Sequence, residues 1–487
     1  MNRAYISQAI SLIDANYIIE AIEAENTLSG EKNGVTNIRN GGAKKRWLGA
    51  VAAVLAVAIL AGVFLRPSDT LTAYAIAEAK YPEMAPYPGE SHTEAAYDAW
   101  WKDIRAQWRD LGDVSPLQAF FARSAGIFLT ADKGRNRVYS PLNVYMALAM
   151  LAQLTDGEGR EQILTVLGSG SMDALRQQVS DVWNDNYRND GALTSVLASS
   201  LWLNRDVTFQ QETMDTLSRD FYASSYRGEM GSERFNEALQ SWLNEQTGGL
   251  LEEQAGKIEL DSETVLALAT TVYFKAKWGY EFSKKRTAPD TFHAPSGNVE
   301  ADFMHQQDDQ AYYWGERFAA VEQHFEGGGS MWFLLPDEGV TPEALLFDSE
   351  AMDFLFTAVK SEWENKEFLI VNKAIPKFDV SSQFELDDGL RALGVTDVFD
   401  PALADFSPMT ADADIPIAVS QANHAARVVI DEEGCTASAF TVIPSPGAEK
   451  PPDEEVDFVL NRPFIFCITG LSGLPLFVGI VNYPAGK

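Results

Sequence analysis

The stretch VVIDEEGCTASAFTVIPSPGAEKPPDEEVDFVLNRP, residues 428–463, joins an acidic pair, a run of small side chains, a Pro-rich segment and an apolar strand pattern. Small residues in series pack poorly as a core and, without repeated glycine, make a poor flexible linker. They suit a segment that must enter a crowded place, such as the middle of an existing sheet. The residues concerned are Glu432, Glu433, Gly434, Cys435, Thr436, Ala437, Ser438, Ala439, Phe440 and Thr441.

The composition indicates a large folded domain that does not bind nucleic acid. The chain has 487 residues, 46% hydrophobic and 11% aromatic, enough for one large core or two ordinary ones. There are 38 Lys and Arg against 70 Asp and Glu, so the formal net charge is -32. Nucleic-acid phosphates demand basic patches, which argues against a nucleic-acid partner. Such a charge keeps a protein soluble in a crowded or extracellular medium.

The chain shows no motif for catalysis, for a metal or for a cofactor. Cys435 and Cys467 are too few for a disulfide framework or a cysteine zinc site, and we interpret both as free thiols. The five histidines show neither HExxH nor i,i+4 spacing. There is no P-loop and no dinucleotide-binding GxGxxG, and GLSGL at 470–474 lacks the GxSxG spacing of a nucleophile. We therefore expect neither an enzyme nor a cofactor-binding protein.

A charge-free apolar run near the N-terminus predicts a membrane span. Trp47–Leu65, WLGAVAAVLAVAILAGVFL, is 19 residues long, just enough to cross a bilayer as a helix. The basic residues at 44–46 predict an N-in, C-out orientation. We expect a single-pass protein of the cell membrane with residues 1–46 cytoplasmic, 47–65 a signal anchor, 66–113 an aromatic linker or extension, and 114–487 a domain outside the cell. A buried helix and a cleaved signal peptide are the alternatives, and the long segment upstream disfavours the latter.

The remaining chain shows helical and strand patterns in an order typical of an α+β fold. Helical spacing spans 116–129, 141–154, 209–222 and 235–246. Strand patterns span 193–203, 265–274, 318–324, 331–335, 368–376, 464–468 and 474–481. Because helices come mostly first and strands mostly last, segregated sheets are favoured over a repeated βαβ unit.

A series of short motifs resembles the serpin family in the family's order, over roughly residues 114–487. Any one motif is weak, and the common order carries the resemblance. The motifs are YSPLN at 139–143 with ALAML at 147–151, YFKAKW at 273–278, TFH at 291–293, MHQ at 304–306, PKF at 376–378, ADFS at 404–407, HAA at 424–426, DEEG at 431–434, NRPF at 461–464 and the closing segment 479–484.

The resemblance implies a bacterial-type serpin with three β-sheets, a main sheet of five to six strands, eight to nine helices and an exposed reactive-centre loop at about 432–456. In that family a target serine protease cleaves the loop and is trapped as an acyl-enzyme, while the loop inserts as a new strand of the main sheet. We expect this chain to be a monomer that inhibits a serine protease in this way. The alternative is a non-inhibitory serpin that acts as a substrate or binding module.

The same resemblance implies the positions of the site residues. Counting 17 residues from Glu432 puts the scissile bond at Ala448–Glu449, whereas counting back from Asn461 leaves any bond within 448–452 open. A small residue before the bond indicates an elastase- or subtilisin-like protease, and a glutamate there indicates a Glu-selective one. The hinge spans 432–441. The residues expected to hold the main sheet shut, or to lie at its top where insertion begins, are Ser140, Asn143, Thr270, Trp278 and His424.

Side chains of an inserted strand would alternate between its two faces. All but Ile443 of the inward set are small, so insertion meets little steric opposition. Pro444 and Pro446 cannot donate ladder hydrogen bonds, which leaves the completeness of insertion open. Two further departures from the family pattern are the oxidisable Cys435 and the bulky Phe440. The inward set is Cys435, Ala437, Ala439, Thr441, Ile443 and Ser445.

Overall fold

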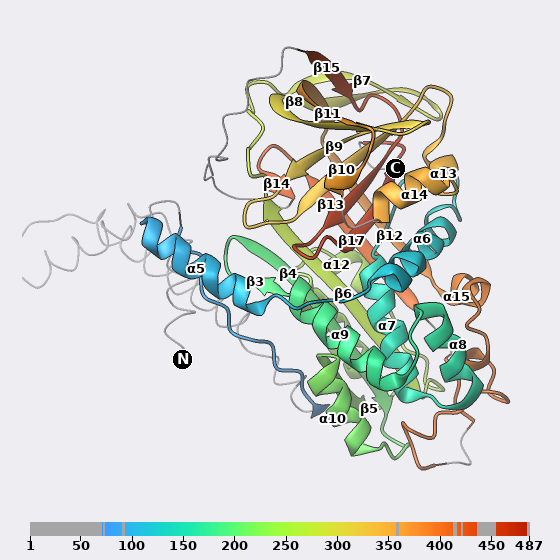
Figure 1. The fold of residues 1–487 in the computed structure, drawn as a ribbon. Coiled ribbons are helices and arrows are strands. Elements are labelled where there is room, and N and C mark those ends of the chain that lie inside the picture. Colours follow the sequence, from blue (N-terminus) through green and yellow to red (C-terminus); the bar gives the residue numbers. More distant parts are fainter. Residues whose placement is uncertain are drawn as a thin grey trace, which may run out of the picture. The chain divides into compact units, whose positions relative to one another are not determined.

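The structure is a computed structural model that describes residues 71, 74–89, 93–356, 360–412, 416–419, 422–435 and 454–484. The chain divides into two compact units, Met1–Ala73 and Tyr74–Lys487. Every element named below belongs to the second unit (Figure 1). The predicted cytoplasmic segment 1–46 and the predicted span 47–65 lie outside the described residues.

The first of two hydrogen-bonded strand networks is the main sheet. Its five long strands, extended at one edge by β1, match the predicted five to six. Because β14 has only two residues, β6 and β13 have no other described strand between them. In order across the sheet, the strands are β1 (Ala75–Ala77), β5 (Ala223–Gly228), β4 (Leu193–Asn204), β6 (Leu266–Lys277), β14 (Gly434–Cys435), β13 (Asn423–Ile430) and β12 (Phe378–Glu385), with β3 (Arg188–Asn189) paired to β4.

The second network is a single set of hydrogen-bonded strands. The joint is β8, an 18-residue strand that pairs with β7 and β11 and, at its end, with β9. Its length makes one continuous network, so two networks replace the three expected sheets. In order, the strands are β15 (Glu455–Val459), β11 (Lys366–Pro376), β8 (Gly297–Trp314), β9 (Phe318–His324), β10 (Ser330–Pro336), β16 (Phe464–Thr469), β17 (Pro475–Val481) and β2 (Arg137–Tyr139), with β7 (Ala288–Ala294) paired to β8.

Eleven α-helices lie in the described part of the chain, against the eight to nine predicted. Three account for the excess, because α5 precedes the predicted domain and α12 and α13 have four residues each. The predicted α+β fold is confirmed, with helices packed against the main sheet (Figure 1). The helices are α5 (Glu94–Gln107), α6 (Ser115–Leu129), α7 (Pro141–Leu154), α8 (Gly157–Leu167), α9 (Met172–Asn186), α10 (Gln211–Asp220), α11 (Glu233–Gln246), α12 (Glu252–Ala255), α13 (Pro342–Leu345), α14 (Ser349–Phe356) and α15 (Asp387–Leu393).

Helix α7 forms the centre of the hydrophobic core. Ser140 caps it by accepting a hydrogen bond from the backbone N–H of Asn143 (3.2 Å), and Pro141 occupies its first turn. Every residue of the helix except Ala147 is buried. The helix packs against both β6 and β17. It therefore ties the main sheet to the second network.

Residues 74–113, where described, pack against the domain that follows. β1 extends the main sheet beside β5. The ring of Tyr81 lies 5.2 Å from Trp183 and 5.5 Å from Tyr187, measured between centroids. On α5, Trp100 and Ile104 are almost fully buried. Aromatic side chains thus anchor this segment, while the predicted boundaries at 66 and 114 stay predictions.

The predicted membrane location is corrected. In the part of the chain that the structure describes, no helix is both long and apolar enough to cross a membrane. The longest, α6 and α9, have 15 residues each. That is about 22 Å of helix, whereas the hydrocarbon core of a bilayer is about 30 Å thick. This finding contradicts the expected single-pass protein of the cell membrane with its domain outside the cell. The membrane is therefore withdrawn as a partner. Both expectations rested on the run 47–65, which lies outside the described residues.

Candidate functional site at the loop attachment

The site begins with a tight turn that connects β13 to β14. The Asp431 carboxylate accepts hydrogen bonds from the backbone N–H groups of Glu433 (2.9 Å) and Gly434 (3.2 Å). The N–H of Asp431 donates in turn to the Gly434 carbonyl (3.0 Å). Aspartate commonly stabilises turns in this way. The turn reverses the chain, so that Cys435 pairs with Ile430 inside the main sheet.

Gly434 and Cys435 fill the position between β6 and β13. On the β6 side, Gly434 lies opposite Lys277 and Cys435 opposite Ala276. A Cβ atom on Gly434 would lie 2.3 Å from the carbonyl oxygen of Ala276, so the close approach requires glycine. Cys435 is 2% exposed, and burial raises the pKa of its thiol to about 12. It is therefore a neutral, packed thiol.

The chain that follows β6 holds the turn from the other side. The indole Nε1 of Trp278 donates to the Asp431 carbonyl oxygen (2.8 Å). The backbone N–H of Trp278 donates to the Glu433 carbonyl (3.2 Å), and that of Phe282 donates to the Glu432 carbonyl (2.9 Å). Three consecutive carbonyls of the turn are thereby fixed.

The two acidic side chains of the turn differ in environment. The Glu432 side chain is 9% exposed, and its Oε2 lies 3.3 Å from Nζ of Lys377. Burial alone would raise the pKa of Glu432, but hydrogen bonds to its carboxylate and the Lys377 ammonium outweigh burial and lower the pKa. Glu433 pairs with Lys284 at the surface, where an ion pair contributes little. Glu432 is thus the structural anion of the turn.

Beyond Cys435, a gap separates β6 from β13, with an apolar cavity on each side of the sheet. Leu268 and Thr270 of β6 line both cavities, whereas the residues between and before them line one cavity each. Leu266 faces the cavity on the α7 side, and Ala267, Ala269 and Thr271 face only the cavity on the α11 side. The first cavity is also lined by Val144, Leu148 and Leu151 of α7, and the second by Leu239 and Leu243 of α11.

A hydrogen-bond network crosses the gap near its middle. The N–H of Ser140 donates to Nε2 of His424 (3.2 Å), and Nδ2 of Asn143 donates to the carbonyl oxygen of Thr270 (3.1 Å). The start of α7 is therefore bonded to both β13 and β6. His424 is 2% exposed, and burial, with a smaller effect of Arg137, lowers its pKa to about 3. The ring is neutral, which leaves Nε2 free to accept.

The predicted site residues gather at two places. Residues 432–435 and Trp278 lie together at the end of the main sheet, and Ser140, Asn143, Thr270 and His424 lie together at its middle. Thr270 contributes its backbone carbonyl to this network. The rest of the predicted hinge, 436–441, and the predicted bond Ala448–Glu449 lie outside the described residues.

The sequence motifs did not indicate which residues bond to the turn. Lys377 and Asp431 stood in recognised motifs, PKF and DEEG, yet the motifs gave them no partner. Phe325, which stacks on Trp278 with ring centroids 5.0 Å apart and planes 9° apart, gave no signal in the sequence. Only the fold brings these distant segments together.

The other end of the loop enters the second network. β15 runs parallel to β11, with Glu455 opposite Ile370. Residues 436–453, which lie outside the described residues, therefore connect the main sheet to the second network. A segment attached in this way can be cut without breaking either network.

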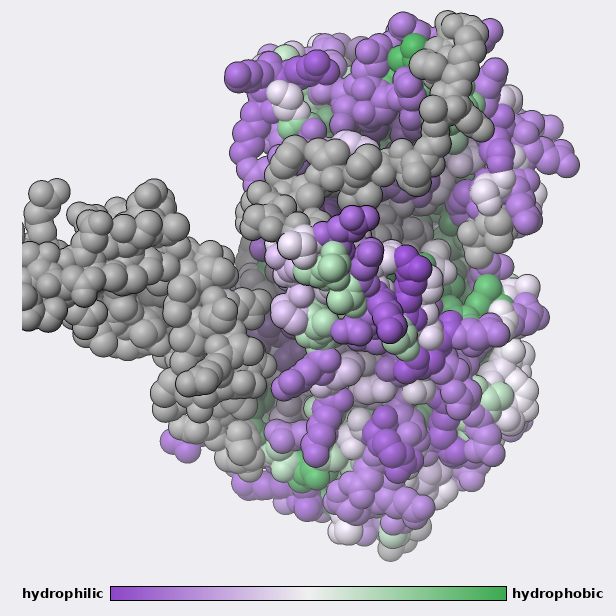
Figure 2. Space-filling model, turned by 60° about the vertical axis from the view of Figure 1, so that its left-hand side comes forward, coloured by the Kyte–Doolittle hydropathy of each residue, from purple (hydrophilic) through white to green (hydrophobic). Residues whose placement is uncertain are grey.

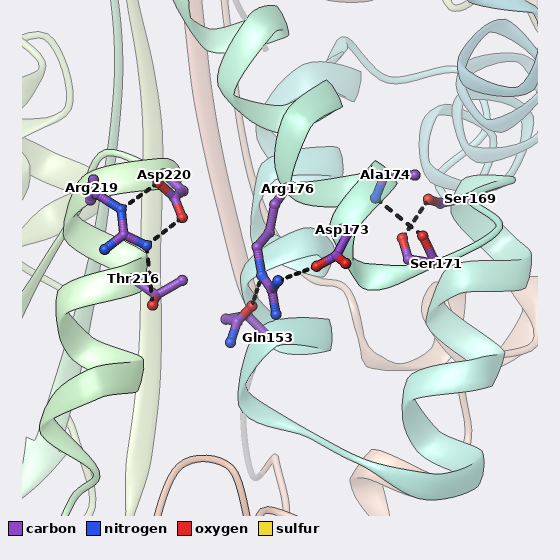
Figure 3. Close-up of polar contacts among 9 residues, drawn as sticks. All are labelled: Gln153, Ser169, Ser171, Asp173, Ala174, Arg176, Thr216, Arg219 and Asp220. Atoms are coloured by element: carbon purple, nitrogen blue, oxygen red, sulfur yellow. Dashed lines mark hydrogen bonds and ion pairs between the residues drawn. The ribbon is translucent and has the colours of Figure 1, made fainter.

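A polar hollow beside α9 and α10 lies in another part of the molecule. Figure 3 shows the polar contacts of its two arginines. There Nε of Arg176 donates to Gln153 (2.8 Å) and its Nη1 to Asp173 (2.6 Å), while Nε of Arg219 donates to Asp220 (2.8 Å). Each guanidinium is balanced by a carboxylate of its own helix, which weakens the hollow as an anion site. Among the described residues, no group of three or more His, Cys, Asp or Glu side chains could hold a metal ion.

Comparison with known proteins decides the family. The family model described as Serpin (serine protease inhibitor) matches residues 118–484, about three quarters of the chain. The chain belongs to the serpin family. The resemblance drawn from the motifs is therefore confirmed at the level of the family, whose members are described as serine protease inhibitors.

Two relatives and one solved structure illustrate how close this serpin is to known ones. "Putative serpin-Z12" of Oryza sativa subsp. japonica is 30% identical over 383 residues, covering 73% of this chain and 87% of the relative. "Plasminogen activator inhibitor 1" of Sus scrofa is 29% identical, covering 73% and 88%. The crystal structure of the thermophilic serpin tengpin in the native state gives a TM-score of 0.67 at 22% identity, covering 82% of this chain and 97% of that one. The predicted bacterial type stays a prediction.

Proposed function

We propose that this serpin inhibits a serine protease as a suicide substrate. The observation that carries the proposal is β14. Two residues of the predicted hinge already form a strand between β6 and β13, at the end of a gap with the same two neighbours. The residues that follow Cys435 can therefore extend this strand without displacing any strand of the sheet.

The register of β14 determines what an inserted strand would meet. Cys435 lies opposite Ala276 in an antiparallel pair, so each further residue pairs with the preceding residue of β6. Residues opposite each other share a face of the sheet. The small side chains would thus point to the α7 side, which is the crowded one. The pairs would be Ala437 with Phe274, Ala439 with Val272, and Thr441 with Thr270.

In the same register, both prolines would lie at the far end of the inserted strand. Pro444 would lie opposite Ala267, and Pro446 beyond Leu266, the first residue of β6. Ladder hydrogen bonds can therefore form along most of β6 before a proline interrupts them. Phe440 would lie opposite Thr271, which lines the apolar cavity on the α11 side.

The inhibitory reaction would follow from cleavage of the loop. The catalytic serine of the protease attacks the carbonyl carbon of Ala448, the amine of Glu449 leaves, and an ester joins protease and inhibitor. Insertion of the cleaved loop then pulls the protease away before water hydrolyses the ester. A bond after a small residue favours an elastase- or subtilisin-like target, and a bond after Glu449, within the window 448–452, favours a Glu-selective one.

The test is incubation with an elastase, a subtilisin and a Glu-selective protease, followed by denaturing electrophoresis and mass spectrometry of the released C-terminal peptide. We expect an SDS-stable adduct and a peptide that begins at Glu449. If all three proteases cut the loop and none forms an adduct, the inhibitory proposal is wrong.

The second candidate is a non-inhibitory serpin that acts as a substrate or binding module. Phe440, Pro444 and Pro446 favour it, because a bulky side chain and missing N–H donors oppose strand insertion. Cleavage without an adduct is the outcome that it predicts.

A further inference from the structure

An exposed sheet face lies beside the second attachment of the loop. β15, β11 and β8 are hydrogen-bonded neighbours at the upper end of the molecule in Figure 1, and that end is largely hydrophilic in Figure 2. In one row across the three strands, Ile370 lies between Glu455 and Asp309. Both carboxylates belong to exposed residues. An apolar side chain is thus flanked by two negative charges.

The next row of the same face repeats the pattern with polar side chains. Asn372 lies between Asp457 and Gln307, donates to Asp457 (3.0 Å) and accepts from Nε2 of Gln307 (2.8 Å). These hydrogen bonds show that the three side chains point to one side of the sheet. On the other side of the Ile370 row, Phe368 is 48% exposed. The face therefore holds two apolar side chains of β11, with Asp309 of β8 on one side and Glu455 and Asp457 of β15 on the other.

A hollow of about 470 Å³ continues the face toward β7. Its charged and titratable residues are Arg286, Asp290, His305, Lys373 and Asp457. Lys373 is buried behind the face, and its ammonium is paired with Asp308 (2.7 Å). The cations Arg286 and Lys366, the latter two residues before Phe368 on β11, are outnumbered by the carboxylates of Asp290, Asp309, Glu455 and Asp457. We call these four residues, with Phe368 and Ile370, the acidic face.

The acidic face lies within reach of anything bound to the loop. Glu455 follows Ala448 by seven residues, a span of at most about 24 Å when fully extended. A protease of about 240 residues has a radius of gyration of about 18 Å. A protease of that size held at Ala448 would therefore be close enough for part of its own surface to contact β15 and β11.

We propose that the acidic face is a second contact for the target protease, and that this protease carries basic and apolar side chains beside its active site. The inference rests on the proposed function, since it assumes that a protease engages the loop. Opposite charges across a contact mainly increase the rate of association. The exposed Phe368 and the half-buried Ile370 supply the apolar centre of the contact.

The test compares two double variants that remove the same charge. Asp309→Asn/Glu455→Gln alters the acidic face, and Glu158→Gln/Glu161→Gln alters exposed positions on α8. Each is mixed with a basic and with an acidic protease that both cleave after small residues, at about 10 and 500 mM salt. With the basic protease at low salt, we expect adduct formation by the acidic-face variant to be about 5-fold slower than by the α8 variant. At high salt the two variants should react alike, and with the acidic protease the acidic-face variant should react no slower than the α8 variant.

If the two variants react at equal rates under all conditions, the acidic face is not a contact for the protease, while the proposed inhibitory function stands. If the loop is cut without an adduct, the rate of loop cleavage becomes the readout. A slower cut in the acidic-face variant would then support the contact and refute inhibition. Phe368→Ala tests the apolar centre in the same assay, and Phe347→Ala is its control at another exposed phenylalanine. An equal loss of reaction rate in both variants would also count against the contact.

Discussion

At the scale of single residues, the hinge turn depends on the absence of a side chain at Gly434. In Gly434→Ala the new methyl group would lie 2.3 Å from the Ala276 carbonyl oxygen, so β14 must shift away from β6. Cys435, buried and neutral in the native protein, would then become reactive. We expect its alkylation by iodoacetamide at about pH 8 to accelerate at least about 10-fold.

Peptide mass spectrometry measures this labelling at each cysteine separately. Cys467 is the internal control, because it is fully buried in β16, far from the turn in sequence, and its pKa is also raised to about 12. It should stay unlabelled in both proteins. Equal labelling of Cys435 with and without the substitution would show that the close approach does not hold β14 in place.

Lys377 is the second residue on which the turn depends. In Lys377→Met the Glu432 carboxylate keeps its buried position but loses its cation, and we expect a loss of about 2 kcal/mol in the free energy of unfolding. Lys284→Met is the matched control, because it removes the partner of Glu433 at the surface, where an ion pair contributes little to stability. Urea unfolding of the three proteins measures both changes, and equal losses would refute the structural role given to Glu432.

At the scale of elements, His424 joins β13 to the start of α7. Its pKa of about 3 in the folded protein is far below the ordinary 6.5. The unfolded chain therefore binds more protons between these values, and stability falls as the pH drops below 6.5. This one group contributes a loss of up to about 1.4 kcal/mol per pH unit.

Between pH 6.5 and 5, where most carboxylates stay ionised, we expect His424→Gln to flatten the decline in stability. Glutamine can still accept a hydrogen bond from the N–H of Ser140 but does not titrate. His293→Gln is the control, because His293 lies on β7 with an exposed side chain and should leave the slope unchanged. Parallel curves for wild type and His424→Gln would remove His424 as the cause.

Elements with strong local signals could be predicted from the sequence, and those fixed by distant partners could not. Ser140 and Pro141 mark the start of α7, and the helix ends at Leu154 as predicted. β8 escaped prediction because its acidic residues interrupt the apolar alternation. Its extent is set by pairing with β7 and β11. The candidate site divides in the same way: motifs located Trp278, but its bond to Asp431, 153 positions away, exists only in the fold.

At the scale of the whole molecule, the gap between β6 and β13 leaves strand-to-strand hydrogen bonds and apolar contacts unformed. A complete strand there would add ladder hydrogen bonds on both sides and bury the small side chains of Ala437, Ala439 and Thr441 on the α7 side. We therefore expect cleavage of the loop by a protease to raise the midpoint of thermal unfolding by more than about 10 °C. An unchanged midpoint would favour the non-inhibitory alternative.

Whether cleavage raises the heat stability of a variant should depend on which face of the inserted strand carries an added charge. By the register of β14, Ala437 would point to the α7 side opposite Phe274, whereas Thr436 would point to the other side opposite Lys275. Ala437→Glu buries an unpaired carboxylate on insertion, so its cleaved form should gain little heat stability and it should behave as a substrate. Thr436→Glu adds the same group beside a lysine, and its cleaved form should gain stability as wild type does. The midpoints of intact and cleaved protein for each variant provide the measurement. If both variants gain equally, the strand does not enter in the register that β14 begins.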